Sequence, residues 1–252
     1  MTTLTLTTEP DIGANRLTIT PTGDITRVRR SDVNGTYDVR TETGQLPHLA
    51  SEGVLVLDDY EAVHGAASYT VTTTVDTVSE SITLALESPW LGTPEAPQFS
   101  APVRSVLTYG AGAATRSTVH EPDGRGDAIV IVLGSSSRRG TMTVEAGDYP
   151  TALNLLRLCQ RGQTMLLRQL QHPGMDLYFL PMQADIVTAL AAGRESQFDL
   201  SVQYIETGRP TGNLSGALGW TWDALAADFA TWDDVAEAYA SWGDLRIDVR
   251  KP

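Results

Sequence analysis

The stretch YTVTTTVDTVSESITLAL (residues 69–86) alternates apolar and polar side chains and predicts two strands, Tyr69–Val75 and Ile82–Leu86. Five similar stretches precede it: Leu4–Thr8, Arg16–Thr20, Ile25–Arg29, Tyr37–Thr41 and Val54–Leu57. Turn-forming sequences such as PTGD, DVNG, TETG and VHGA separate them. Seven short strands without a helix predict that residues 1–88 form an immunoglobulin- or fibronectin-like β-sandwich.

Prolines at positions 89, 94 and 97 interrupt this pattern, so ESPWLGTPEAP (87–97) is predicted to break regular structure and to connect two domains. Trp90 lies in this connector, either as an anchor between the domains or as a buried linker residue.

Residues 89–210 form the second predicted domain, which is rich in β-strands with one flanking helix. The helix is expected over about 150–161, because Pro150 suits a first helical turn and Gly162 a helix end, with Leu153, Leu156 and Leu158 supplying apolar contacts. The expected strands are Val103–Tyr109, Ser117–His120, Ala128–Leu133, Gly140–Glu145, Met165–Leu170, Leu177–Met182, Ile186–Leu190 and Gln197–Ile205.

Residues 211–252 combine a linker with a ten-residue repeat, TWDALAADFATWDDVAEAYASWGDL (221–245). Large apolar residues recur at helical spacing, and Thr221, Thr231 and Ser241 precede each unit as helix caps. Short helices of this kind are marginal alone and need a surface on which to bury tryptophan. The segment is therefore either a helical cap on its own domain or a docking tail for another chain. The predicted docking residues are Trp222, Leu225, Phe229, Trp232, Val235, Tyr239, Trp242 and Leu245.

The composition limits the classes of function. The chain has 252 residues, a net charge of −13 and a single lysine, Lys251, which does not favour direct binding of nucleic acid. It begins without a signal-peptide pattern and contains no apolar stretch of about 18 residues, so we expect a protein made in the cytoplasm without membrane insertion. The only cysteine, Cys159, suits a buried position on the predicted helix.

Candidate catalytic and metal-binding groups give no coherent pattern. The four histidines, His48, His64, His120 and His172, lack the spacing of a zinc site, so we predict no metal and no cofactor. GAGAATRS (110–117) lacks the last glycine of a dinucleotide loop and is predicted to be part of a hairpin. PDGRGD (122–127) offers Asp123 and Asp127 as calcium ligands but is more typical of a turn.

Two further clusters of polar residues are predicted to have a structural rather than a catalytic role. Asp58, Asp59 and Glu61 are predicted to lie on a strand-to-turn surface, since adjacent strand residues point apart rather than across a catalytic cleft. The serine run Ser135–Ser137 has no GxSxG elbow and is predicted to be a loop. We therefore expect a protein that is not an enzyme.

Several stretches together resemble minor tail proteins of long-tailed, siphovirus-type phages that infect actinobacteria, in particular the distal-tail-protein type. They are VLVLDDYEAVHGAASYTVT (54–72), SPWLGTPEAPQFSAPV (88–103), RRGTMTVEAGDYPTALNLLRLCQRGQTMLLR (138–168), Gly208–Pro210 and TWDDVAEAYASWGDL (231–245). The resemblance spans nearly the whole chain and rests on the order of these stretches.

The resemblance implies a virion protein of the tail tip that forms a ring between the tail tube and the host-facing hub. The implied partners are further copies of the chain, six-fold by family expectation with three-fold as the alternative, the tail tube protein, the tape measure protein and hub or spike proteins. Residues 89–210 would be the tail-tube-like domain and residues 1–88 the peripheral one, whereas the family typically has the ring domain first.

The sequence leaves one other class open. A sandwich domain that displays loops, together with tryptophans, which stack well on sugars, also suits a module that binds glycan on the host surface.

Overall fold

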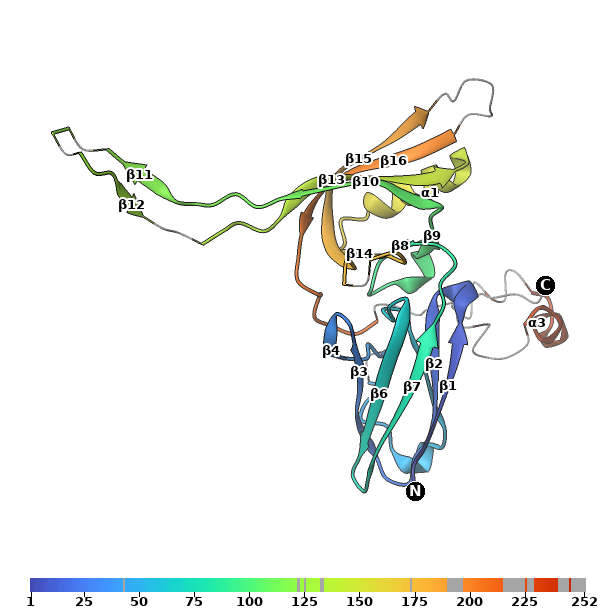
Figure 1. Cartoon of the computed structure of the whole chain (residues 1–252). Coiled ribbons are helices and arrows are strands. Elements are labelled where there is room, and N and C mark those ends of the chain that lie inside the picture. Colours follow the sequence, from blue (N-terminus) through green and yellow to red (C-terminus); the bar gives the residue numbers. More distant parts are fainter. Residues whose placement is uncertain are drawn as a thin grey trace.

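The computed structural model describes residues 1–42, 44–121, 123–124, 126–131, 134–172, 174–189, 197–214, 225, 229–239 and 245. It confirms a mainly β fold with few helices (Figure 1). Two β-rich parts lie one above the other in this view, a long hairpin projects to one side, and a short helix lies on the other.

The N-terminal sandwich, residues 3–84, consists of two antiparallel sheets. The first has the order β1 (Thr3–Glu9), β2 (Ala14–Thr20), β5 (Leu55–Asp59). The second has the order β4 (Gly35–Asp38), β3 (Ile25–Asp32), β6 (Gly65–Thr73), β7 (Thr77–Leu84). This is the predicted immunoglobulin-like architecture, in which alternate residues of both sheets face one core.

That core follows from the period-two pattern. Leu17 and Ile19 of β2 and Leu55 and Leu57 of β5 are buried against Tyr69 and Val71 of β6 and further residues of β3. On β6 the residues that alternate with Tyr69 and Val71, such as Thr70 and Thr72, are only partly buried. The alternation seen in the sequence therefore sets which face of each strand is turned inward.

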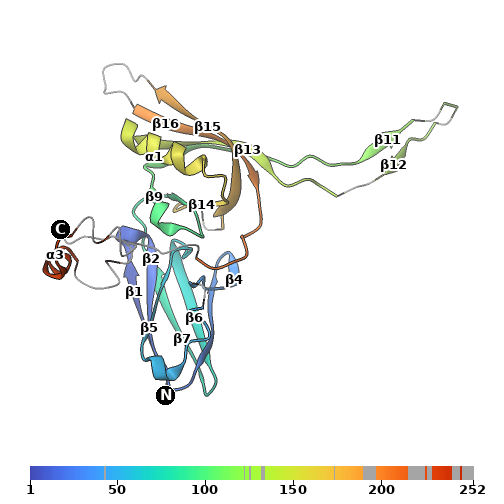
Figure 2. The ribbon, with the colours of Figure 1, turned by 180° about the vertical axis from the view of Figure 1, so that it is seen from behind.

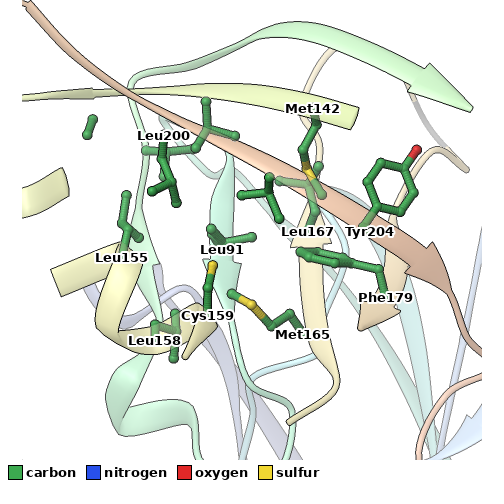
Figure 3. Packing of buried hydrophobic residues seen from close by; sticks show 14 of the residues in the cluster. Leu91, Met142, Leu155, Leu158, Cys159, Met165, Leu167, Phe179, Leu200 and Tyr204 are labelled. Carbon is green, nitrogen blue, oxygen red and sulfur yellow. The ribbon is translucent and has the colours of Figure 1, made fainter. Parts of the chain in front are cut away.

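The second part is one antiparallel seven-stranded sheet. Its order is β10 (Ser105–Gly112), β13 (Arg139–Gly147), β16 (Gln197–Glu206), β15 (Leu177–Ala189), β14 (Met165–Arg168), β8 (Trp90–Gly92), β9 (Ala101–Pro102). The helix α1 (Tyr149–Cys159) covers one face, and Figure 3 shows Leu155, Leu158 and Cys159 directed at Leu91, Met165 and Leu200 of the sheet.

Helix α1 begins where the sequence supplies a cap. The carboxylate of Asp148 accepts a hydrogen bond of 2.8 Å from the backbone N–H of Thr151, and Pro150 occupies the first turn. Its buried residues are Ala152, Leu155, Leu158 and Cys159, whereas the predicted contacts Leu153 and Leu156 are half-buried. Cys159 is buried, as expected, and this burial raises the pKa of its thiol to about 12.

Two predictions about this part were wrong. The connector does not lack regular structure, because β8 pairs with β14 and β9 inside the sheet. Over the described residues, the predicted strands Leu177–Met182 and Ile186–Leu190 are one strand, β15, which ends at Ala189 before the undescribed Leu190. A bulge between Pro181 and Gln183 accommodates the proline, which has no N–H to donate.

The hairpin between β10 and β13 leaves the sheet as an arm, defined here as residues 113–138 (Figures 1 and 2). It contains β11 (Thr118–His120) and β12 (Ile129–Ile131), which pair antiparallel, and a bridge between Thr115 and Ser135 nearer the sheet. The predicted hairpin at 110–117 is thus confirmed, and the described residues of 122–127 form its turn.

Three short 3-10 helices complete the two parts: η1 (Pro10–Ile12), η2 (Ala50–Glu52) and η3 (Pro97–Phe99). In the tail the structure describes α3 (Trp232–Ala238). Within the described residues, no helix is both long and apolar enough to cross a membrane.

Candidate functional site

The described apolar residues of the predicted docking tail pack on one another. Leu225, Val235, Tyr239 and Leu245 are buried in one cluster, with Phe229 and Ala238 against it. The rings of Phe229 and Tyr239 meet edge to face, with centroids 5.9 Å apart. These apolar residues therefore bury one another and are not exposed to solvent.

One predicted docking residue is the exception. Trp232 is 57% exposed at the first position of α3. Thr231 caps this helix as predicted, in a reciprocal capping box with Asp234. Trp222 and Trp242, and the caps Thr221 and Ser241, lie outside the described residues. Docking of the tail to another chain remains a prediction. Within α3, Trp232 is the large apolar side chain that is exposed.

The second feature is the junction, the contact between the N-terminal sandwich and the seven-stranded sheet. Glu61 lies at its centre and is 3% exposed. Its carboxylate accepts hydrogen bonds from Arg209, from Tyr178 at 2.9 Å and from Arg40 at 3.4 Å. Arg40 also donates to the carbonyls of Pro210 and Gly212. One sandwich carboxylate thus holds both the sheet and the segment that leaves it.

The charges of this cluster are tied to one another. Burial alone would lower the pKa of Arg209, but hydrogen bonds to Glu61 and its negative charge raise it. Burial, together with the charge of Glu61, raises the pKa of the Tyr178 hydroxyl. The guanidinium of Arg209 also lies over the Tyr37 ring, 5.3 Å from its centroid. The Arg209 guanidinium is therefore held both by the Glu61 carboxylate and by the Tyr37 ring.

The prediction that Asp58, Asp59 and Glu61 lie on the surface was wrong, since all three are at most 4% exposed. Their expected divergence is correct: Asp58 binds Arg16, whereas Asp59 accepts two hydrogen bonds from Arg30 on another strand. Each buried carboxylate has an arginine partner, which is the condition for burying such charges.

Asp59 extends the ionic cluster into the sandwich core. It accepts from the Tyr69 hydroxyl at 2.8 Å, and Asn15 donates to that hydroxyl at 3.0 Å. Burial would raise the pKa of Asp59, but the charge of Arg30 and its hydrogen bonds hold it below its ordinary value.

A second contact of the junction surrounds Trp90, which is 7% exposed. Its ring packs with Ala62, Leu84 and Leu86 of the N-terminal part, although Trp90 itself belongs to β8 of the sheet. Of the two alternatives for this residue, the interface anchor is correct.

Arg168 of β14 lies 5.4 Å from the Trp90 ring and donates to the carbonyls of Gly13 and Ala62 in the sandwich. Burial lowers its pKa to about 10. Gly13 has φ +63°, and a Cβ there would stand 2.6 Å from the Arg168 guanidinium and 2.9 Å from the Trp90 ring. Only glycine fits at this close approach.

A third contact joins the turn after β3 to the loop between β14 and β15. Asp176 accepts 2.7 Å hydrogen bonds from the Asn34 side chain of the sandwich and from the backbone of Gln169. Burial raises the pKa of Asp176.

The exit segment closes the junction. Leu214 donates a 2.9 Å backbone hydrogen bond to Thr41 and forms a parallel bridge with Glu42, so residues 207–214 return along the sandwich.

The third feature is the arm, which is exposed along almost its entire described length. Val119, Ile129, Val130 and Ile131 are 44–56% exposed on it. Among the described residues, β11 and β12 pair only with each other, so each presents an open strand edge. Exposed apolar side chains beside open edges are the hallmark of a surface that pairs with another chain.

The remaining candidates have structural surroundings. His48 contacts Gly53 and Glu52, and His64 accepts a hydrogen bond from the backbone of Leu86. Ser136 donates and accepts hydrogen bonds with Ala114 across the arm, inside the predicted serine loop. Asp123 and Asp127 lie in the turn of the arm, and in the part of the chain that the structure describes no cluster of metal-binding side chains occurs.

Sequence reasoning missed the junction because its partners are far apart: Glu61 and Arg209 are separated by 148 residues. The usable signals were Arg168 at the end of the apolar run MLLR and the charged residues within DDYE. A charge inside an apolar strand indicates a buried partner, although it does not identify that partner.

These features define a mainly β protein with a buried ionic junction, a projecting arm and a helical tail. No known protein family matches the chain, and no curated protein matches it. Among solved structures the chain is similar to one from the "Cryo-EM structure of the anti-feeding prophage (AFP) baseplate, 6-fold symmetrised". The sequence identity is 14%, the match covers 54% of this chain and 99% of that chain, and the TM-score is 0.32.

Proposed function

We propose that the chain is a structural, non-enzymatic component of a bacteriophage tail tip. In this proposal copies of the chain form a ring that joins the tail tube to the host-facing hub. Its partners are other copies, the tube and tape measure proteins and the hub or spike proteins, and it is located in the virion. The sequence resemblance described above supplies the setting, and the arm is the observation that carries the assembly role.

The arm needs a partner for physical reasons. An isolated two-stranded hairpin is marginally stable in water, and β11 and β12 pair over only three residues each. Burying the exposed halves of Val119, Ile129, Val130 and Ile131 on a neighbour would contribute about 4 kcal/mol, taking roughly 1 kcal/mol for each half-exposed side chain. Pairing along either open edge would add backbone hydrogen bonds.

The layout of the chain suits a ring. The arm and α3 lie on opposite sides of the two β-rich parts (Figures 1 and 2). A contact made by different surfaces of neighbouring copies closes into a ring when the rotation between the copies permits it. The near balance of charge in the middle of the chain, 11 acidic and 10 basic residues over positions 89–210, limits repulsion between copies in contact.

The test is a double substitution on the arm, Ile129→Thr with Ile131→Thr, which keeps strand propensity and removes apolar surface. The matched control is Val54→Thr with Val56→Thr, two exposed valines at the same spacing on the sandwich. We expect the full chain to form rings by light scattering and negative-stain imaging, the arm variant to be a folded monomer, and the control to form rings. Rings of unchanged stability in the arm variant would refute the role of the arm, and a monomeric parent chain would refute self-assembly.

A further inference from the structure

Helix α1 carries more apolar surface than the sheet beneath it covers. Tyr149, Leu153 and Leu156 follow one another at i, i+4 and i+7, so they share one face of the helix, beside the residues that point into the core. Tyr149 is 49% exposed, and Leu153 and Leu156 are half-buried. The ring of Phe198, from β16, meets that of Tyr149 edge to face, with centroids 5.4 Å apart. We call these four residues the α1 stripe; Leu156 and Phe198 join it to the core of the sheet.

The arm presents an apolar surface of matching spacing. Ile129 and Ile131 lie on the same face of β12, because successive strand residues point to opposite faces, and they are 44% and 48% exposed. They are about 7 Å apart along the strand. Tyr149 and Leu153 are about 6 Å apart along the helix axis. Each isoleucine can therefore contact a separate residue of the stripe.

The arm does not reach the stripe of its own chain. The nine-residue strand β13 separates them, with the arm before its first residue and α1 after its last. From Ser105, which pairs with Glu145, to Thr118, which pairs with Ile131, the chain advances thirteen residues. At about 3.3 Å per residue, Ile131 lies roughly 40 Å from the end of the sheet at which α1 begins. The arm points away from that end (Figures 1 and 2), so an arm that occupies the stripe belongs to another chain.

The charges near the two surfaces are complementary. Residues 149–161 contain two arginines and no acidic residue, and Asp148 precedes the first turn of the helix. The arm has the opposite arrangement, with Arg116 towards the sheet and three acidic residues and one arginine over 121–127 at its turn. Arg116 and Arg157 are exposed, and in the part of the chain that the structure describes neither forms an ion pair. Opposite charges can therefore meet at both ends of the contact.

Direction and length agree with this pairing. Figure 1 shows α1 running from the far end of the sheet back towards the side from which the arm leaves. The arm of a copy displaced along this direction, in the same orientation, would lie beside α1 with Arg116 at the Asp148 end and the acidic turn at the Arg157 end. Arg116 and Glu121 are about 17 Å apart along an extended strand, and Asp148 and Arg157 about 14 Å apart along a helix. Both charge contacts can therefore form at once.

We propose that the α1 stripe is the seat of the arm of a second copy, with Ile129 and Ile131 packed on Tyr149 and Leu153. The proposal rests on the assembly role described above and names the two sides of its contact. Because the arm and the stripe are different surfaces at opposite ends of one sheet, the contact is head to tail and can repeat around a ring.

The experiment mixes two full-length variants that each lack one side of the contact. The stripe variant is Tyr149→Gln with Leu153→Gln, which removes apolar surface and keeps helix propensity. The arm variant is Ile129→Thr with Ile131→Thr. By light scattering over a concentration series, we expect each variant alone to be a folded monomer and their equal mixture to form dimers without rings, because one intact arm meets one intact stripe. The control, Asn154→Gln at an exposed position on another face of α1, should form rings like the parent chain.

A charge reversal tests the same contact without changing apolar residues. Arg157→Glu should raise the concentration at which half of the chains are assembled by about fivefold, the effect of one exposed ion pair. Adding Asp127→Arg to the same chain should restore the parent value, because the two charges then attract again. Loss of assembly that Asp127→Arg leaves unrepaired would count against the proposed direction of the arm.

The outcomes separate the seat from the assembly role. If the arm variant is monomeric but the stripe variant forms rings like the parent chain, the seat is refuted and the assembly role stands. A mixture of the two variants that stays monomeric also refutes the seat, since the arm and the stripe are then not two sides of one contact. If the parent chain is monomeric at every concentration, both proposals are refuted.

Discussion

Replacing Glu61 by Gln tests whether the junction is held by its buried charges. The change keeps the size of the side chain and one acceptor oxygen but removes the negative charge that faces Arg40 and Arg209. Both guanidinium groups would remain largely buried, with side-chain exposures of 4% and 20%. Breaking a buried ion pair from one side costs about 3–5 kcal/mol, and the retained oxygen places the expected loss near the lower limit, about 3 kcal/mol.

The assay is thermal unfolding of the parent chain and the variant. For a chain of this size, 1 kcal/mol shifts the unfolding temperature by about 2–4 °C, so Glu61→Gln should lower it by roughly 6–12 °C. Limited proteolysis should also cut residues 207–214 faster, because Arg40 and Arg209 anchor that segment to the sandwich.

The matched control is Glu206→Gln, which breaks the ion pair with Arg138 at the end of the sheet. The two side chains of that pair are 28% and 52% exposed, and exposed ion pairs contribute about 0–1 kcal/mol. Equal shifts in the two variants would refute the claim that burial makes the Glu61 cluster the stronger contact. A further variant, Glu61→Gln with Arg209→Met, should regain part of the loss, because it removes one of the uncompensated charges.

Three further predictions follow from single side chains. Gly140→Ala should destabilise the chain by about 3 kcal/mol in urea unfolding, since its Cβ would stand 1.6 Å from the carbonyl oxygen of Gly110, whereas Gly112→Ala, with open space around it, should be nearly neutral. Hydrogen bonds from Thr2, above all, lower the pKa of Asp76 to about 2; this carboxylate therefore stabilises the fold above about pH 4, and the contribution is lost as the pH falls through 2. Asp76→Asn should remove that part of the pH dependence of the urea midpoint. Cys159 should react with a thiol reagent at pH 8 far faster in urea than in the native chain, because burial raises its pKa to about 12.

The sequence predicts the elements whose signals are local. Alternation from Leu17 to Ile19 and from Tyr69 to Thr73 fixes which strand faces are buried, and Pro150 and the capping residue Thr231 indicate where α1 and α3 begin. These features depend on neighbours within four residues, which a single sequence contains.

The junction was beyond sequence reasoning because its energetics depend on distant partners. Adjacent acidic residues normally indicate a solvent-exposed position. Asp58 and Asp59 are buried because they form ion pairs with Arg16 and Arg30, which lie on other strands. The strand β8 was missed for a related reason: three residues between prolines have no period, and pairing with β14 and β9 makes Trp90–Gly92 a strand. The pairing of β8 with β14 joins residues 74 to 78 positions apart, which leaves no local signal.

The ionic junction has a direct consequence for the proposed ring. The arm grows out of β10 and β13 of the sheet, and the exit segment 207–214 returns along the sandwich, so the direction of the arm relative to the sandwich is set by how the sheet and the sandwich meet. A ring closes only if the rotation that relates neighbouring copies is the same at every contact. If the sandwich and the sheet were joined by a flexible hinge, this rotation would vary from one contact to the next. Glu61, Arg168 and Asp176 hold the two parts at three separate points, which fixes a rigid body against both tilting and twisting. Burying these charges gives little stability over an apolar contact, but it specifies one orientation, and one orientation is what a closed assembly requires.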